Sequence, residues 1–253
     1  MCDSMRLELD VGNTRLKWRL VVASGEVVSK GVSAVTASTD AFVGLGGLEY
    51  SQLQKVLISS VSNAEFNERL TNHWISKVGV GKVIVAAARP VMGGVDLAYK
   101  NVSALGIDRC LAMMAAYSVS PEGVCVIDCG SAITIDYVSA GGSHEGGYIL
   151  PGLALLKNGL FDGTANVAIP EVLHNGVFPG RDTEECVGRG MNLMLRATIL
   201  SAIAVARELS IESIVFTGGD AGFVLELCDV ECECLPDLVF EGLGLYAAEL
   251  GLL

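Results

Sequence analysis

Hydrophobic and polar residues alternate in two similar stretches of the chain. An alternating run over 7–11 is followed by another over 16–21, and a run over 124–129 is followed by one over 133–138. An Asp-x-Gly sequence with a polar residue separates the two runs each time, and glycine and asparagine accept the backbone angles that a hairpin requires. The pattern predicts two β-hairpins, whose aspartates Asp10 and Asp128 are 118 residues apart.

Strand-like and helix-like segments alternate along the rest of the chain. Short apolar runs predict strands over 55–60, 82–86, 144–150 and 213–217. Longer segments predict helices over 63–77, 103–119, 182–208 and 239–252, and one from Pro151 onward. Such an alternation is typical of an α/β fold with substantially parallel sheets.

Local signals at two helix starts and the spacing of the repeat refine this prediction. Asn63 is an expected N-cap, and Asp182–Glu185 is similar to a capping box. The two copies of the hairpin are separated by about half the length of the chain, which indicates a duplication. We therefore expect two similar domains, over 1–118 and 119–253.

Composition favours a folded protein outside the membrane. Apolar residues make up 51% of the chain and charged residues 18%, enough for a sizeable core. The longest stretch without a charged residue is 110–121, whereas a bilayer span needs about 20 apolar residues. The first residues lack the apolar segment of a secretory signal. We expect a cytoplasmic protein without a membrane partner.

Charge and cysteine content exclude or disfavour several further classes. The net charge is −12, with 29 acidic and 17 basic residues, and such a surface repels nucleic acid. Eight cysteines include no Cys-x-x-Cys pair, and the three histidines are scattered. Packing roles for the cysteines are therefore favoured over a disulfide framework or a metal site.

The paired turns carry the chemistry of a nucleotide site. Phosphate binding favours glycine, whose backbone N–H approaches closely, and a nearby carboxylate organises Mg²⁺. Residues 10–14 and 128–131 each offer both, and Gly218-Gly219 follows a third predicted strand. One copy alone is equally an ordinary Asp-Gly hairpin, but the duplication favours a nucleotide site. The arrangement resembles the actin, sugar kinase and Hsp70 superfamily, in which ATP lies in a cleft between duplicated, ribonuclease H-like domains.

Other motifs allow both a structural and a functional interpretation. Asp108 is either a helix-capping residue or a general base beside Arg109. Thr183 is either part of a capping box or a substrate contact, and Tyr99 is either an exposed strand-end aromatic or a substrate contact. Residues 146–152 form either a strand-to-helix turn or a wall beside the transfer centre.

Two further nucleotide signatures are not supported. No Gly-x-x-x-x-Gly-Lys-Ser/Thr sequence occurs, so a P-loop is not expected. Residues 242–247 match Gly-x-Gly-x-x-Ala, but too few residues follow for the next strand and acidic ribose ligand of a Rossmann unit. These glycines are interpreted as helix-packing positions.

The motifs occur in an order that resembles the type III pantothenate kinase family. The resemblance extends over about residues 6–250 and rests on the following segments: Asp10–Thr14, Tyr99, Gly106–Arg109, Asp128–Asp136, Gly146–Gly152 and Thr217–Asp220. It implies ATP-dependent phosphorylation of pantothenate to 4′-phosphopantothenate, the first step of coenzyme A biosynthesis. Such an enzyme is a phosphotransferase with an alcohol acceptor.

The resemblance also implies roles for individual residues. Asp108 would accept the proton of the pantothenate hydroxyl, Asp10 would organise Mg²⁺, directly or through water, and Asp128 would bind a monovalent cation, K⁺ or NH₄⁺. The implied ATP-binding residues are Asp10, Val11, Gly12, Asn13, Thr14, Arg15, Leu16, Lys17, Ser131, Gly218 and Gly219. The implied pantothenate-binding residues are Tyr99, Gly106, Ile107, Asp108, Arg109 and Thr183. Family members are usually homodimers, with substrate pockets completed across the interface.

One departure and two alternatives accompany the resemblance. Ser131 stands where the family usually has threonine, so the hydroxyl is kept while the packing of a methyl group is lost. The alternatives are a kinase of the same superfamily for another small hydroxylated substrate, and a non-catalytic nucleotide-binding regulator. The presence of Asp10, Asp108, Arg109 and Asp128 favours catalysis, and the central expectation is that the three aspartates meet at one cleft.

Overall fold

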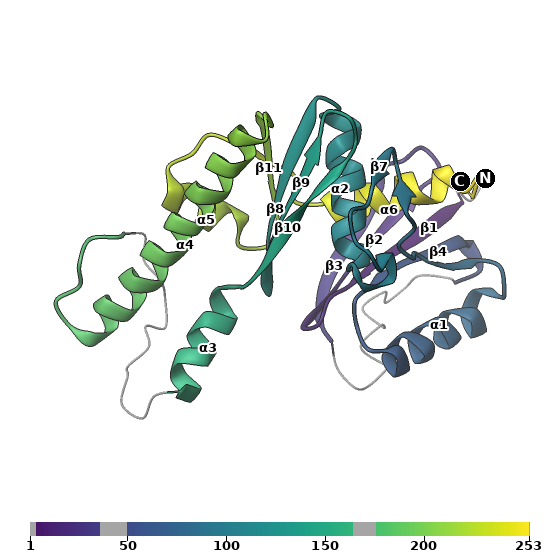
Figure 1. The fold of residues 1–253 in the computed structure, drawn as a ribbon. Coiled ribbons are helices and arrows are strands. Elements are labelled where there is room, and N and C mark those ends of the chain that lie inside the picture. Colours follow the sequence, from purple (N-terminus) through teal and green to yellow (C-terminus); the bar gives the residue numbers. More distant parts are fainter. Residues whose placement is uncertain (1–3, 36–49, 164–175, 253) are drawn as a thin grey trace. The chain divides into compact units, whose positions relative to one another are not determined.

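A computed structural model describes residues 4–35, 50–163 and 176–252 of the chain (Figure 1). The chain separates into two compact units. The first comprises Met1–Gly93, Tyr99–Ala115 and Val239–Leu253, and the second comprises Gly94–Ala98 and Ala116–Leu238. The C-terminal segment thus belongs to the first compact unit, whereas the duplicated-domain boundaries 1–118 and 119–253 stay a prediction.

The first unit is built on a five-stranded sheet in the order β3-β2-β1-β4-β5. Its strands are β1 (Met5–Val11), β2 (Arg15–Val22), β3 (Val27–Ala34), β4 (Leu53–Ser60) and β5 (Val83–Val85). The first three strands are antiparallel neighbours, and β4 and β5 run parallel to β1. The hairpin predicted from the alternating pattern is confirmed as β1–β2.

The second unit repeats this arrangement strand for strand. Its order is β10-β9-β8-β11-β12. The strands are β8 (Gly123–Cys129), β9 (Ala132–Ser139), β10 (His144–Pro151), β11 (Ser213–Thr217) and β12 (Glu233–Cys234). Again three antiparallel strands are followed by two parallel ones. The duplication is confirmed at the level of topology. Both sheets are mixed rather than substantially parallel, because the two hairpin strands and the strand that follows them are antiparallel.

The helices follow the sequence pattern closely, with two shifted starts. They are α1 (Ala64–Val78), α2 (Ile107–Val119), α3 (Leu153–Gly163), α4 (Thr183–Glu208), α5 (Ala221–Cys228) and α6 (Leu238–Glu249). Short elements complete the described chain: β6 (Val91–Met92), β7 (Val95–Asp96) and the 3₁₀ turns Tyr50–Gln52 and Val102–Ala104. The helix predicted over 103–119 starts at Ile107, since a 3₁₀ turn precedes it. The helix predicted from Pro151 starts at Leu153, because Pro151 ends the edge strand β10.

The predicted caps position two of the helices. Asn63 Oδ1 accepts a hydrogen bond from the Phe66 N–H at 2.9 Å, and Asp182 Oδ1 accepts one from the Glu185 N–H at 2.8 Å. The return contact of the capping box is displaced by one residue, since the Glu185 carboxylate accepts from the N–H of Arg181 at 2.9 Å. Both helices therefore begin where the sequence predicts.

The core of the first unit lies between its sheet and α1 (Figure 1). Phe66, Leu70 and Trp74 of α1 pack against buried residues of β1 and β4. Helix α6 packs on α2 so closely that a Cβ at Gly242 would lie 2.0 Å from the Leu111 carbonyl oxygen. The interpretation of this glycine as a helix-packing position is confirmed.

A partly buried ionic network joins α6 to β1 and β2. Arg19 of β2 donates to the fully buried Glu8 of β1 and, from Nη1, to Glu241 Oε1 of α6 at 2.6 Å. Burial lowers the pKa of Arg19, but the bonds and charges of Glu241 and Glu8 outweigh this effect and raise it. Because each buried charge is paired, the network fixes α6 against the strand that carries Asp10.

The core of the second unit joins its sheet to α4 and α5. It includes Cys125, Cys129 and Cys228, and Cys232 packs against it, so these cysteines have the packing role that was predicted. Cys234 is exposed, so the predicted packing role is wrong for that residue. Burial raises the pKa of the Cys228 thiol to about 11 and raises those of Cys125 and Cys129 further. Within the described parts of the chain, no helix is long and apolar enough to cross a membrane.

Candidate active site

The first hairpin turn presents polar groups at the end of β1. Asp10 is the penultimate residue of β1 and lies opposite Lys17 of β2, and the Ser59 hydroxyl donates to Asp10 Oδ1 at 3.4 Å. The Gly12 N–H donates to the Arg15 carbonyl at 2.9 Å and closes the turn.

The residues of this turn divide by exposure. Asn13, Thr14 and Arg15 are exposed, whereas the side chains of Val11 and Leu16 are buried in the core. The side chains of the two apolar residues are therefore inaccessible to a ligand, whereas the polar tip of the turn is exposed.

The second hairpin turn has the same plan in the second unit. Asp128 is the penultimate residue of β8 and lies opposite Thr134, at the position that Lys17 has in the first hairpin. The Gly130 N–H donates to the Ala132 carbonyl at 3.0 Å, and Ser131 is exposed at the tip. This turn is one residue shorter than the turn of the first hairpin. The Asp128 carboxylate and the Ser131 hydroxyl lie at the same end of the sheet.

The diglycine after β11 packs directly on this turn. Gly218 has φ +93°, and a Cβ there would lie 2.4 Å from both Asp128 Oδ1 and the Cys129 carbonyl oxygen. The Asp220 N–H also donates to that carbonyl at 2.9 Å. Only glycine satisfies both the backbone angle and the close approach. The structure thus brings together Asp128 and the Gly218-Gly219 segment, which are distant in sequence.

The glycine-rich segment 146–152 also contributes to this turn. A Cβ at Gly152 would lie 2.3 Å from the Gly130 carbonyl oxygen and 2.6 Å from that of Ser131. The Gly152 N–H donates to the Ser131 carbonyl at 3.1 Å. The segment is therefore the strand-to-helix turn and packs closely on the second hairpin, whereas its place beside a transfer centre stays a prediction.

Asp108, Arg109 and Tyr99 form a second polar cluster in the first unit. Asp108 Oδ1 accepts from the Arg109 N–H at 2.8 Å. Arg109 Nη1 donates to the Tyr99 hydroxyl at 2.9 Å, with the guanidinium carbon 5.6 Å from the ring centroid. Arg109 is only 6% exposed. A buried guanidinium oriented by an aromatic ring suits a carboxylate ligand.

Val61 connects this cluster to the first hairpin. Its N–H donates to the Val11 carbonyl at 3.0 Å, and its Cγ1 lies 3.6 Å from the position of a Cβ on Gly106. Gly106 itself leaves room for Asp108, because that Cβ would be 2.5 Å from Asp108 Oδ1. The segments that carry Asp10 and Asp108 therefore meet in one unit. Sequence reasoning missed Val61, since an apolar residue after a strand carries no signal of such a role.

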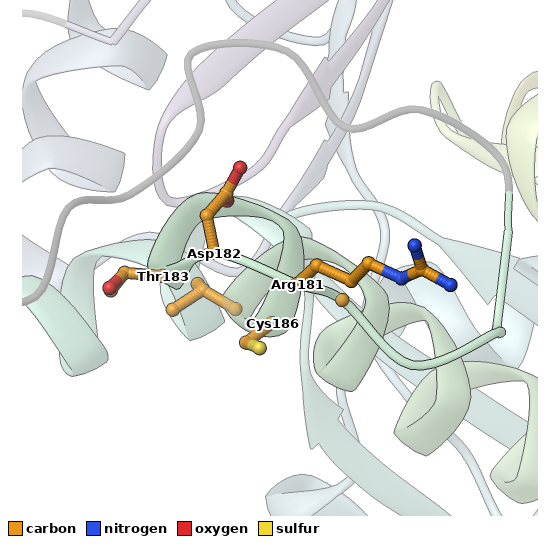
Figure 2. A pocket seen from close by; sticks show the side chains of 6 residues that line it. Arg181, Asp182, Thr183 and Cys186 are labelled. Carbon is orange, nitrogen blue, oxygen red and sulfur yellow. The ribbon is translucent and has the colours of Figure 1, made fainter.

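Thr183 lies at the start of α4, on an open pocket of about 540 Å³. The lining residues are Gly180, Arg181, Asp182, Thr183, Cys186 and Val187. In Figure 2 the side chains of Arg181, Asp182 and Thr183 diverge from the helix start. Asp182 caps the helix, so Thr183 is not needed for that purpose and its exposed side chain faces the pocket region.

The predicted site residues are thus divided between the two units. Asp10, Lys17, Tyr99 and the segment 106–109 lie in the first, and Asp128, Ser131, Gly218, Gly219 and Thr183 lie in the second. Ile107 and Arg109 are both buried at 6% exposure, and the contacts of Ile107 with a substrate stay a prediction. The meeting of Asp10 and Asp108 with Asp128 stays a prediction.

Comparison with solved structures defines the class of fold. A conserved Baf-family protein from Campylobacter jejuni is 24% identical, with TM-score 0.64, and covers 98% of this chain and 100% of its own. The activator of 2-hydroxyisocaproyl-CoA dehydratase from Clostridium difficile, solved with ADPNP, is 11% identical with TM-score 0.54, and the match covers 97% of this chain and 94% of that one. With its two equivalent mixed sheets, the chain has the duplicated, actin-like fold that the sequence predicted.

Sequence comparison identifies the family within this class. The model of the type III pantothenate kinase family matches residues 6–204. A type III pantothenate kinase of Hahella chejuensis is 37% identical over 241 residues, which cover 95% of this chain and 96% of the relative. A type III pantothenate kinase of Pseudomonas syringae is 37% identical over 248 residues, which cover 95% of this chain and 98% of the relative. The chain belongs to the type III pantothenate kinase family, and membership implies phosphorylation of pantothenate in coenzyme A biosynthesis.

Proposed function

We propose that this chain transfers the terminal phosphoryl group of ATP to the hydroxyl of pantothenate. The observation that carries the proposal is the set of turns at equivalent strand ends, with Asp10 and Asp128 each penultimate in its strand. Phosphoryl transfer needs in-line positioning and compensation of charge, which backbone donors, cations and a few side chains supply.

ATP binds, in this proposal, to both hairpins and the diglycine. Exposed backbone and polar groups at residues 12–15 approach the phosphates, with Lys17 beside Asp10 adding positive charge. Ser131, Gly218 and Gly219 provide further contacts with ATP in this proposal. The protein has a net charge of −12, so these local donors must overcome an unfavourable overall field.

Asp108 acts as the general base and Arg109 as the anchor of the substrate. The Asp108 carboxylate would accept the proton of the attacking hydroxyl, a contribution of roughly 10²–10⁴-fold. Arg109, oriented by Tyr99 at 2.9 Å, would pair with the pantothenate carboxylate. Gly106 leaves space for Asp108. Thr183 would provide a further contact with pantothenate.

We assign two cations to carboxylates of the chain. Asp128 Oδ1 and the Cys129 carbonyl oxygen are close neighbours, since each would lie 2.4 Å from a Cβ on Gly218, and oxygen donors suit a hard cation. We assign K⁺ or NH₄⁺ to Asp128, and Mg²⁺ to Asp10, directly or through water. When bound, these cations neutralise charge on the phosphates.

The proposal includes a homodimer in the cytoplasm. Exposed apolar side chains occur on α3 and α4 of the second unit, namely Leu155, Phe161, Leu193 and Met194. We propose the homodimer from family membership, and these side chains are candidates for its interface. Buried core thiols such as Cys125 and Cys129 are typical of a reducing compartment.

A coupled ADP-release assay with pantothenate, ATP, Mg²⁺ and K⁺ tests the function. We expect turnover that requires pantothenate, falls when Na⁺ replaces K⁺, and exceeds that with a panel of sugars and short hydroxy acids. Turnover of another substrate in preference to pantothenate, or ADP release that pantothenate does not change, would contradict the proposal. Indifference to the cation would remove the assignment of Asp128.

A further inference from the structure

The segment that leads into α4 is held by side chains of that helix. We name residues 176–182 the α4 loop. Arg189, two turns into α4, donates from Nη1 to the carbonyl oxygens of Pro179 at 3.0 Å and Phe178 at 3.3 Å. Its Nη2 donates to Glu185 Oε1 at 3.0 Å. One guanidinium thus joins two loop carbonyls to the first turn of the helix.

Further contacts hold the α4 loop at both ends. Asn192, which is fully buried, donates from Nδ2 to the Gly176 carbonyl at 3.0 Å. The second carboxylate oxygen of Glu185 accepts from the Arg181 N–H at 2.9 Å. A Cβ at Gly180 would lie 2.4 Å from the Cys186 nitrogen, so the backbone at this glycine lies directly on the helix. Together these contacts hold residues 176–182, the segment that leads to Thr183.

The Arg189 contacts fix geometry more than they add stability. The side chains of Arg189 and Glu185 are 36% and 40% exposed, and an ion pair so exposed contributes little to the free energy of unfolding. A planar guanidinium, however, holds several acceptors in one fixed arrangement, which an ammonium group cannot do. Loss of Arg189 should therefore release the α4 loop while leaving the fold intact.

We infer that Arg189 is a positioning residue for substrate binding. Through the Phe178 and Pro179 carbonyls and Glu185, it fixes the α4 loop and thereby the position of Thr183 at the edge of the pocket (Figure 2). Arg189 acts on the substrate through Thr183 and does not touch it. The inference rests on the proposed function, in which Thr183 contacts pantothenate.

The test compares Arg189→Ala and Arg189→Lys with a matched control, Arg207→Ala. Arg207 lies in the last turn of the same helix and is exposed. For Arg189→Ala we expect the KM for pantothenate to rise about tenfold, since small displacements of positioning groups cost this much or more. The KM for ATP and kcat should change by less than about twofold. Arg189→Lys should lie between the alanine variant and the unaltered protein, because lysine keeps the charge but loses the fork.

Amide hydrogen exchange provides a readout that does not depend on activity. In Arg189→Ala, the N–H groups of Arg181 and Glu185 should exchange at least about tenfold faster, with those of the sheet unchanged. Unchanged exchange would overturn the positioning role even if pantothenate is the substrate. Faster exchange with an unaltered KM for pantothenate would overturn the link to Thr183. Failure of the proposed function appears separately, as a lack of pantothenate turnover in the unaltered protein.

Discussion

The Asp108 carboxylate accepts a hydrogen bond at the start of α2, and we propose that it is also the general base. Its Oδ1 accepts from the Arg109 N–H at 2.8 Å, a contact that an asparagine oxygen can also make. Asp108→Asn should therefore keep the fold and ATP binding but lower kcat by roughly 10²–10⁴-fold, because the amide cannot accept a proton. Steady-state kinetics and calorimetric titration with ATP measure the two effects. Near-normal turnover would remove Asp108 from the role of base.

Gly218 is the residue whose replacement most directly disturbs Asp128. An alanine Cβ would lie 2.4 Å from Asp128 Oδ1 in a backbone with φ +93°. Gly218→Ala should destabilise the fold by about 1–3 kcal/mol and raise the K⁺ concentration needed for half-maximal activity. Thermal unfolding and a K⁺ titration of ADP release measure these changes. Gly141→Ala is the control, since a Cβ there meets no atom within 4 Å. Equal K⁺ dependence in both variants would contradict the assigned cation site.

At the scale of elements, the packing of α6 on α2 makes a sharp prediction. A Cβ at Gly242 would lie 2.0 Å from the Leu111 carbonyl, so Gly242→Ala should force the helices apart and lower the unfolding free energy by about 1–3 kcal/mol. In contrast, Gly222→Ala on α5 should stabilise by about 0.5–1 kcal/mol, because a Cβ there meets open space. Urea unfolding compares the two variants, and a destabilisation equal in both would contradict the close helix contact.

Elements set by local sequence were predictable, and those set by distant packing were not. The β1–β2 and β8–β9 hairpins and the Asn63 cap depend on neighbouring residues, so their patterns identify them. The strand Val27–Ala34 was not predicted, because nearly all of it is exposed and no buried face imposes an alternation. The start of α3 was misplaced because an edge strand tolerates Pro151.

The family was predictable from the sequence, whereas the contacts within the candidate site were not. The order of the motifs that contain Asp10, Asp108 and Asp128 indicated the family, and the roles of these residues stay a prediction. The contact of Val61 with the Gly106 segment and that of Gly152 with Ser131 depend on residues brought together only by the sheets. Single-sequence patterns carry no record of such contacts, so the connection between the Asp10 turn and α2 was found only in the structure.

At the scale of the whole molecule, the buried thiols predict a loss of stability in alkali. Burial raises the pKa of Cys228 from 9.0 to about 11, and those of Cys125 and Cys129 more. The folded state therefore holds these protons more tightly than the unfolded state. Stability is unaffected by them below about pH 9 and falls above it, by up to about 1.4 kcal/mol per pH unit for each thiol.

Urea unfolding between pH 8 and 11 measures this effect, and Cys228→Ala serves as the comparison. The variant should show a shallower decline with pH than the unaltered protein, because one of the titrating thiols is gone. The exposed Cys186 should react with a thiol reagent in the folded state, whereas Cys125 should react only on unfolding. Identical pH slopes in the two proteins would contradict the role assigned to Cys228.

The central claim is our proposal that Asp10, Asp108 and Asp128 all act on one reacting phosphoryl group. A crystal structure with a non-hydrolysable ATP analogue, Mg²⁺, K⁺ and pantothenate tests it most directly. We predict the Asp108 carboxylate within about 2.6–3.2 Å of the pantothenate hydroxyl, with the triphosphate between the Asp10 and Asp128 turns. A nucleotide bound to one unit alone, with Asp108 remote from both ligands, would contradict the account.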